Sequence, residues 1–298
     1  MSNVEPRFGR LITAMVTPFN DERELDLDRA QALATRLIEG GNDSLIINGT
    51  TGESPTVFYP QKIELFRAVV EAVGGKAPVI ANVGDNCTAD TVDFAKDVAK
   101  LGVDGFMCVV PYYNKPPQEG MYQHFKTIAD AVELPIILYN IPGRCVVNME
   151  AETTLRLAND CENVIAVKEA SGKMDQIATI AAAAPEGFSV YSGDDSATYD
   201  IMRLGGVGVI STTGNVAPER MKELVTKCAE GKWDEAWAAH EALLPLMNGL
   251  FETSNPILVK EALKLVGFPV GGVRLPLIDA TAEQSARLAS IMREVGVL

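Results

Sequence analysis

The chain has 298 residues with 26 Lys and Arg against 40 Asp and Glu, which gives a formal net charge of −14 at pH 7. A charge of this sign argues against nucleic acid or an anionic membrane as the main partner, because both attract basic surfaces. It does not exclude a small anionic substrate, since a local cluster of positive groups can override the net field.

The N-terminal segment, residues 1–9, contains Glu5, Pro6 and Arg7 and no apolar run, so we predict no signal peptide. Beyond it, no apolar stretch reaches the ~18 residues that a membrane span requires. The five cysteines are odd in number, scattered, and never arranged as C-x-x-C. This usage is typical of reduced thiols, so we expect a cytoplasmic protein.

Eight short apolar runs rich in Val and Ile predict buried strands, because each is too short for a helix and is bounded by Gly, Pro or polar residues. In chain order these strands span residues 11–16, 44–48, 78–82, 105–109, 135–140, 164–168, 189–193 and 208–211. A segment of helical periodicity follows each strand. The predicted helices span residues 26–39, 60–73, 90–101, 118–131, 150–159, 174–183, 197–204 and 218–229, with Asp26 as the N-cap of the first and Gly40-Gly41 as its stop.

Eight strand–helix units in series favour a closed (β/α)8 barrel, the TIM barrel fold of the α/β class, over an open doubly wound sheet. A dinucleotide-binding sheet requires a G-x-G-x-x-G motif after the first strand, and none occurs there. The barrel would occupy residues 1–229 and carry the active site. Residues 230–298 predict three more helices, 233–250, 256–266 and 282–295, as a C-terminal helical subdomain that serves assembly or covers the site.

The two histidines, His124 and His240, fall in predicted helices and neighbour no other ligand residue at metal spacing. We therefore predict packing or surface histidines and no metal site. Cys145 stands next to Arg144, and we interpret it as a passive thiol.

Functional residues of a (β/α)8 barrel lie at the carboxyl ends of its strands. Lys168 ends the sixth predicted strand, on the same expected face as Val164 and Ala166. If that face lines the barrel, the apolar wall lowers the pKa of the amine and yields a nucleophile that forms Schiff bases with ketones. In the simpler alternative, Lys168 and Glu169 begin a solvated loop.

Other strand ends carry groups that suit the same chemistry. Tyr139 ends the adjacent strand, where it can reach the same small molecule and transfer protons. Residues 49–52, Gly-Thr-Thr-Gly, offer backbone N–H groups and two hydroxyls for a carboxylate. Arg144 offers a bidentate fork for a second carboxylate. The simpler interpretations are a core aromatic residue, an ordinary glycine turn and a surface charge, respectively.

Four motifs in this order resemble the dihydrodipicolinate synthase family, also called 4-hydroxy-tetrahydrodipicolinate synthase, within the superfamily of class I pyruvate-dependent aldolases and N-acetylneuraminate lyase. The motifs are Gly49-Thr50-Thr51-Gly52-Glu53-Ser54, Pro111-Tyr112-Tyr113-Asn114, Tyr139-Asn140-Ile141-Pro142-Gly143-Arg144 and Val167-Lys168-Glu169-Ala170. The likeness runs from Ile12 through Ser211 and continues weakly at Ser254-Asn255-Pro256 and Arg274-Leu275-Pro276.

The resemblance implies condensation of pyruvate with L-aspartate 4-semialdehyde, the entry step to lysine and diaminopimelate, without a cofactor. Lys168 would form the imine with pyruvate. Tyr139, Thr50 and Tyr113 would form a proton relay, with Tyr113 reaching in from a neighbouring subunit of a homotetramer, a dimer of dimers. Substrate binding would use Thr51 for the pyruvate carboxylate, Arg144 for the semialdehyde carboxylate, and the backbones of Gly193 and Ile210 around the imine.

Sister families, N-acetylneuraminate lyase and the 2-keto-3-deoxy-sugar-acid aldolases, share the lysine and the tyrosine. They usually carry Ser at the position of Thr50 and lack an arginine at that of Arg144, so the two residues together favour the synthase. A non-catalytic binding or regulatory barrel is a third interpretation, against which the intact set of Lys168, Tyr139 and Thr50 argues.

Lysine-inhibited members of this family hold lysine at the dimer interface, and the resemblance places such an allosteric site at Asn86, Tyr112, Asp90 and Tyr59. Asp90 is shorter than the usual glutamate, and Tyr59 and Lys62 stand where inhibited enzymes have histidines. Because Lys62 would repel a second cation, we predict weak or absent inhibition by lysine.

Overall fold

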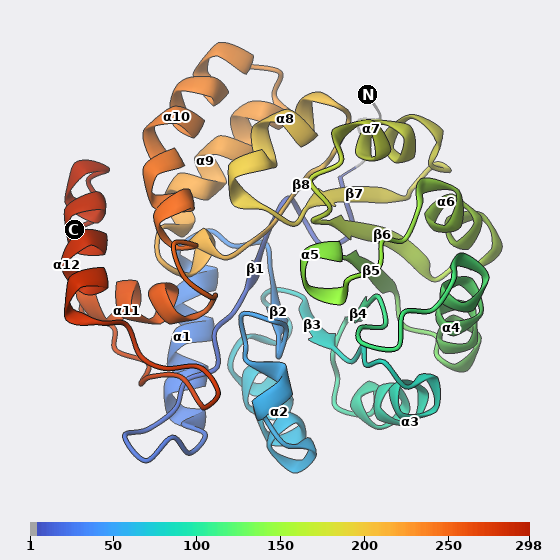
Figure 1. Cartoon of the computed structure of the whole chain (residues 1–298), viewed down its shortest axis with the longest axis horizontal. Helices are drawn as coiled ribbons and strands as arrows, with labels where there is room; N and C mark the ends of the chain where they lie inside the picture. Colours follow the sequence, from blue (N-terminus) through green and yellow to red (C-terminus); the bar gives the residue numbers. More distant parts are fainter. Residues whose placement is uncertain (1–4) are drawn as a thin grey trace.

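The computed structural model describes residues 5–298. We predict no signal peptide in residues 1–9, and the first four of these residues lie outside the described part of the chain. Eight parallel strands, each paired with the next and the last with the first, close a barrel (Figure 1). The predicted TIM barrel with a helical extension is therefore confirmed. The strands are β1 Leu11–Ala14, β2 Ser44–Ile47, β3 Val79–Asn82, β4 Gly105–Val109, β5 Ile136–Asn140, β6 Val164–Glu169, β7 Ser189–Ser192 and β8 Gly208–Ser211.

Helices surround the barrel, and every predicted one is present. They are α1 Leu27–Glu39, α2 Tyr59–Val73, α3 Thr88–Ala99, α4 Gln118–Ala131, α6 Ala151–Asp160, α7 Met174–Ala183, α8 Thr198–Arg203 and α9 Pro218–Ala229. The Asp26 side chain caps α1 as predicted, because it accepts from the backbone N–H of Arg29 at 2.9 Å. The periodicity did not predict four short helices, since three or four residues carry no helical pattern. These are α5 Pro142–Cys145 and the 3-10 helices η1 Ser54–Thr56, η2 Asp195–Ala197 and η3 Thr213–Asn215.

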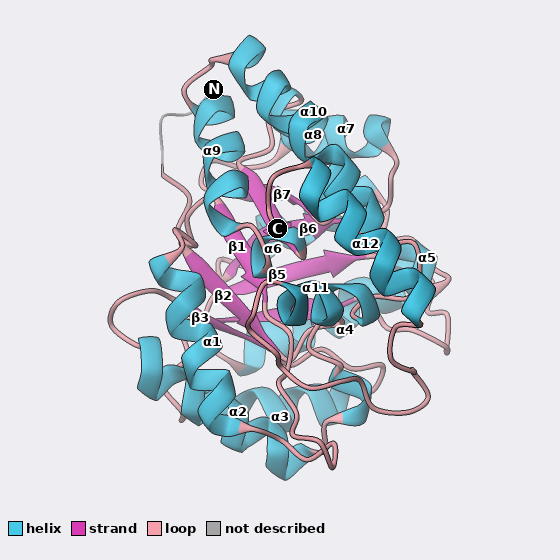
Figure 2. Ribbon diagram, turned by 90° about the vertical axis from the view of Figure 1, so that its left-hand side faces the viewer, coloured by secondary structure: helices cyan, strands magenta, loops and turns pink. Residues whose placement is uncertain are grey.

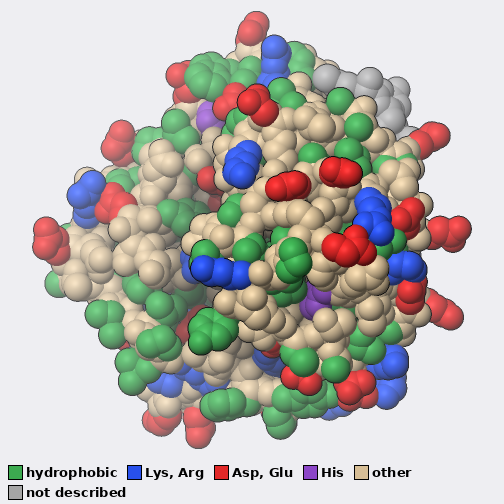
Figure 3. Space-filling model, turned by 45° about the vertical axis from the view of Figure 1, so that its right-hand side comes forward, with side chains coloured by type: hydrophobic (Ala, Val, Ile, Leu, Met, Phe, Trp, Pro, Cys, Tyr) green, Lys and Arg blue, Asp and Glu red, His purple; other side chains and the backbone are tan. Residues whose placement is uncertain are grey.

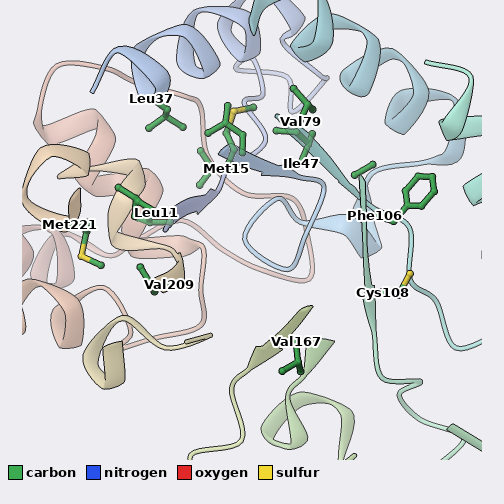
Figure 4. Packing of buried hydrophobic residues seen from close by; sticks show 14 of the residues in the cluster. Leu11, Met15, Leu37, Ile47, Val79, Phe106, Cys108, Val167, Val209 and Met221 are labelled. Atoms are coloured by element: carbon green, nitrogen blue, oxygen red, sulfur yellow. The ribbon is translucent and has the colours of Figure 1, made fainter. Parts of the chain in front are cut away.

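The strands are buried on both faces, which explains their continuous apolar sequences. Side chains toward the barrel axis form an inner cluster that includes Ile12, Ile46 and Tyr139. The other faces join a larger outer cluster with the helices, in which Leu11 and Met221 belong together (Figure 4). This two-layer packing makes the barrel a rigid frame for the side chains at its mouth.

Strand β6 departs from the predicted alternation at one point. Ile136 and Ile137 of β5 pair with Val164 and Ala166, so Ile165 is an extra residue in a bulge. Val164 consequently belongs to the outer cluster, whereas Ala166 belongs to the inner one. The prediction that Val164 shares a face with Ala166 and Lys168 was wrong, because the bulge shifts the alternation by one residue.

The C-terminal tail consists of α10 Trp233–Gly249, α11 Ile257–Leu265 and α12 Ala282–Glu294. In Figures 1 and 2 these helices lie against one side of the barrel, beside α9 and α1. Their buried side chains, such as Leu243 and Leu258, belong to the same outer cluster as Leu224 of α9. The barrel and the tail therefore share one core. The division after residue 229, where α9 ends, stays a prediction.

Charged side chains of both signs are interspersed over the face shown in Figure 3. On this face the acidic excess of the chain is thus spread over many positions. Within residues 5–298, no helix combines the length and the apolar character that crossing a membrane requires.

Candidate active site

A pocket of about 430 Å³ opens among the carboxyl ends of the strands. Its lining includes Thr50 after β2, Asn82 of β3, Tyr112 after β4, Tyr139 of β5 and Arg144 of α5. In a (β/α)8 barrel this end is where functional side chains meet. Lys168 and Thr51 are buried, with exposed fractions of 6% and 3%, and are not among the lining residues of this pocket.

Lys168 and Tyr139 stand at the same register of neighbouring strands β6 and β5. The Lys168 Nζ lies 4.3 Å from the centre of the Tyr139 ring. Burial is the main cause that lowers the pKa of Lys168 to about 8, and the nearby Arg144 guanidinium lowers it further. The neutral amine is therefore accessible near neutral pH, as a Schiff-base nucleophile requires. The alternative of a solvated loop lysine does not fit this geometry.

Tyr139 and Thr50 line the same pocket. Burial raises the pKa of Tyr139 to about 12, although Thr50 and Arg144 both act in the opposite direction. The phenol thus keeps its proton at neutral pH. The structure brings Tyr139, Thr50 and Arg144 together at one pocket.

Asp195 is a buried acid near Lys168 to which the sequence analysis gave no role. Its Oδ2 accepts from the backbone N–H groups of Thr212 at 3.1 Å and Thr213 at 2.7 Å, and from the Thr213 hydroxyl at 2.8 Å. Its charge raises the pKa of Lys168 and so opposes the effect of burial. Asp195 follows the end of the seventh predicted strand, and this position could have identified it as a candidate site residue.

The loop that carries Thr50 and Thr51 is tightly closed. The backbone N–H of Glu53 donates to the Thr50 carbonyl at 3.1 Å, and the Thr17 hydroxyl donates to the Gly52 carbonyl at 2.6 Å. The Thr51 hydroxyl oxygen accepts from the Asn255 side-chain amide at 2.8 Å. The predicted carboxylate-binding loop is therefore held from both the barrel and the tail.

Gly193 and Ile210 both lie near the residues of the candidate site, and their predicted backbone roles stay predictions. A methyl group on Gly193 would lie 3.1 Å from Lys168 Cγ and 2.7 Å from the Ala170 Cβ. A side chain at this position would thus clash with Ala170 and crowd Lys168. Ile210 of β8 is buried in the inner cluster with Tyr139.

Tyr113 is not brought to the pocket within one chain. Its side chain is 88% exposed, and its backbone has a left-handed φ of 74°. Left-handed backbone at a bulky residue is strained and occurs preferentially at functional positions. A contribution of Tyr113 to a neighbouring subunit stays a prediction.

A second pocket of about 360 Å³ adjoins the first and shares Lys62 and Asp85 with it. Tyr59 and Asp90, two of the four residues predicted for an allosteric site, line this second pocket. The third, Tyr112, lines the first pocket instead.

The fourth predicted allosteric residue, Asn86, joins this region by donating its side-chain amide to the Tyr112 carbonyl at 3.1 Å. Burial lowers the pKa of Lys62, and the opposite charge of Asp85 raises it. The four predicted residues therefore lie in one region, and whether it binds lysine stays a prediction.

Both histidines are buried in the protein. Of the two predicted alternatives, packing or surface histidines, the structure shows the first. His124 Nδ1 lies 2.8 Å from the Thr88 hydroxyl, and burial lowers its pKa to about 4. His240 packs against the rings of Tyr199 and Trp237.

Cys145 lines the pocket, but burial raises the pKa of its thiol to about 11, which suits a passive role.

Known proteins similar to this chain cover almost its whole length. The sequence model of the Dihydrodipicolinate synthetase family matches residues 7–295. The 4-hydroxy-tetrahydrodipicolinate synthase of Moorella thermoacetica is 53% identical over 292 residues, which are 98% of this chain and 100% of that protein.

Solved structures agree with this relationship. The dihydrodipicolinate synthase of Cyanidioschyzon merolae with lysine bound has a TM-score of 0.97 and 45% identity, covering 99% of this chain and 100% of that one. A variant described as the first monomeric dihydrodipicolinate synthase has a TM-score of 0.95 and 43% identity, covering 97% of both chains. This chain belongs to the dihydrodipicolinate synthetase family.

Proposed function

We propose that the chain condenses pyruvate with L-aspartate 4-semialdehyde to 4-hydroxy-tetrahydrodipicolinate, in lysine and diaminopimelate biosynthesis, through a Schiff base on Lys168. The observation that carries this proposal is the buried Lys168 amine, which pairs in register with Tyr139 on the neighbouring strand. A relative that is 53% identical to this chain is a 4-hydroxy-tetrahydrodipicolinate synthase.

The reaction begins when the neutral Lys168 amine attacks the ketone carbon of pyruvate and water leaves. The resulting protonated imine makes the pyruvate methyl group acidic, and loss of one proton gives an enamine. The enamine carbon then forms a bond with the aldehyde carbon of the semialdehyde, whose oxygen takes up a proton. Finally, the amino group of the second substrate attacks the imine carbon, and Lys168 leaves as the free amine.

Proton transfers in these steps are assigned to Tyr139 and Thr50, with Tyr113 of a neighbouring subunit as the third member. The position of Tyr139 and Thr50 at one pocket supports this relay. We assign the pyruvate carboxylate to Thr51 and the semialdehyde carboxylate to Arg144. The closed loop around Thr51 and the position of Arg144 at the pocket support these roles.

Gly193 and Ile210 complete the proposed site through backbone groups around the imine. The close approach of Gly193 to Lys168 supports this part. The scheme uses no cofactor. We also propose a cytoplasmic homotetramer, a dimer of dimers in which a second copy supplies Tyr113 to the relay.

Borohydride reduction in the presence of pyruvate tests the Schiff base. We expect one stable pyruvyl adduct per chain, located at Lys168 by peptide mass analysis. The Lys168→Ala variant is the control and should remain unlabelled. An unlabelled Lys168 in the wild-type protein would remove the imine mechanism.

The second substrate requires a separate assay. Initial rates with L-aspartate 4-semialdehyde, N-acetylneuraminate and 2-keto-3-deoxygluconate should be compared side by side on the same preparation. We expect turnover with pyruvate and the semialdehyde. Preferential cleavage of either sugar acid would instead identify the lyase or aldolase activity of the sister families, and no turnover would favour a binding barrel.

A further inference from the structure

Two short motifs in the tail, around Asn255 and Arg274, converge on the loop that carries Thr51. The backbone N–H of Arg274 donates to Glu53 Oε2 at 2.8 Å. The Asn255 side chain donates from Nδ2 to the Thr51 hydroxyl oxygen at 2.8 Å. The tail thus contacts the proposed pyruvate-carboxylate site itself.

The contact from Asn255 determines what the Thr51 hydroxyl can do. A threonine hydroxyl has one proton and two lone pairs. Because Asn255 donates, it occupies a lone pair of Thr51 and leaves the Thr51 proton free for another acceptor. The nearest hydroxyl, that of Thr212, lies 3.4 Å away, which is long for a bond between two oxygens. A carboxylate is a much better acceptor for that proton.

The side-chain oxygen of Asn255, Oδ1, supports a functional role for this residue. Asn255 is 7% exposed, and its Oδ1 has no hydrogen-bond partner among residues 5–298. A half-satisfied buried amide lowers stability compared with an apolar side chain of the same shape. Local costs of this kind are expected at functional sites.

We propose that Asn255 is a positioning residue for pyruvate: it orients the Thr51 hydroxyl so that its proton points to the substrate carboxylate. This rests on the proposed function, in which Thr51 binds that carboxylate. Asn255 does not touch the reacting atoms, and it acts through Thr51 alone.

Contacts other than that of Asn255 also hold the loop of Thr51 in place. A variant at Asn255 can therefore test the orientation of the Thr51 hydroxyl without removing all support of the loop. Lys260 of α11 forms a buried ion pair with Glu53, and Thr17 holds the Gly52 carbonyl. These contacts remain when Asn255 is replaced. We therefore expect an Asn255 variant to keep its fold and to lose affinity for pyruvate specifically.

The test measures the pyruvate concentration that gives half-maximal borohydride labelling of Lys168. Asn255→Ala should raise this concentration about tenfold or more, because hydrogen bonds to charged groups contribute about that factor. The KM for the semialdehyde should stay within about twofold of the wild type. The control is Asn248→Ala, an exposed position of the same tail, which should change neither value.

Two further variants make the result specific. Asn255→Asp keeps the shape but accepts the Thr51 proton and repels the substrate carboxylate, so its half-saturating pyruvate concentration should exceed that of Asn255→Ala. In a Thr51→Val background, Asn255→Ala should add little, since its effect passes through the hydroxyl.

Each outcome separates this inference from the proposed function. If wild-type Lys168 is not labelled by pyruvate, the proposed function fails. If the wild type is labelled normally and Asn255→Ala or Asn255→Asp labels at the same pyruvate concentration, the positioning role is wrong. Full additivity with Thr51→Val would also overturn it, because it would place Asn255 outside the Thr51 contact.

Discussion

Lys260 and Glu53 form an ion pair inside the protein, with Nζ 2.6 Å from Oε1 and both side chains 2% exposed. Lys260 also donates to the Gly272 carbonyl at 2.8 Å. The pair joins the loop of Thr50 and Thr51 to helix α11 of the tail. Burial lowers the pKa of Lys260 to about 8 even though Glu53 raises it, so desolvation outweighs the attraction between the charges.

Replacing one member of this pair should destabilise the fold strongly. Lys260→Met leaves the Glu53 carboxylate buried without its partner, so we expect the free energy of unfolding to fall by about 3–5 kcal/mol. Urea denaturation measures this change. Lys264→Met is the matched control, because Lys264 lies on the same helix with a 66% exposed side chain. The double variant with Glu53→Gln should recover much of the loss, and a fully stable single variant would contradict the argument.

Imine formation should depend on pH through Lys168. Only the neutral amine attacks pyruvate, so the rate should rise with pH and level off above the pKa of about 8. Asp195→Asn removes a negative charge that raises this pKa, and we expect the midpoint to move to lower pH. The measurement is kcat/KM for pyruvate between pH 6 and pH 10. A rate that is still rising steeply at pH 10, as expected for the ordinary lysine pKa of 10.5, would show that the amine is not desolvated.

Arg144 should affect the second substrate more than the first. Arg144→Ala removes a charged partner of a carboxylate, so the KM for the semialdehyde should rise about 10-fold to 100-fold. Pyruvate labelling of Lys168 should change much less, and mainly by a shift to higher pH, because Arg144 also lowers the pKa of Lys168. Arg156→Ala on the outer helix α6 is the control for loss of an arginine. Equal damage to both substrates would argue that Arg144 supports the pocket as a whole.

His124 should make the protein sensitive to acid. Its pKa is lowered from 6.5 to about 4, so the unfolded chain binds this proton before the folded one does. Stability is therefore present above pH 6.5 and is lost as pH falls towards 4, by about 3 kcal/mol in total.

The variant His124→Asn isolates this contribution. Its stability deficit at pH 7, measured by urea denaturation, should shrink as the pH falls towards 4.5. All other titrating groups are common to both proteins and cancel in the difference. Parallel curves for the two proteins would show that His124 titrates normally.

Lysine should inhibit the enzyme weakly or not at all. Lys62 lines the pocket that contains Tyr59 and Asp90, and its ammonium would repel the lysine side chain. Initial rates at increasing lysine concentration test this, and Lys62→Ala should show stronger inhibition than the wild type. Strong inhibition of the wild type by sub-millimolar lysine would disprove the prediction.

Local sequence patterns predicted the elements of this barrel because burial and periodicity act over a few residues. They placed Lys168 and Tyr139 one strand–helix unit apart, which is enough to predict that they meet in a parallel sheet. They did not predict α5, which holds Arg144 at the pocket, because its four residues contain no repeat of the helical pattern. The bulge at Ile165 was also missed, since it arises from pairing with β5.

The sequence by itself thus determined the barrel, the proposed nucleophile with its neighbouring tyrosine, and the family, because each depends on residue type and local spacing. Only the tertiary structure decided which distant residues surround these groups. Asp195 lies near enough to Lys168 for its charge to raise the pKa of the amine, Asn255 reaches Thr51 from 204 positions away, and Tyr113 stays outside the pocket of its own chain. The physical reason is that contacts between distant segments are set by how helices and strands pack together, and no pattern of neighbouring residues records that packing.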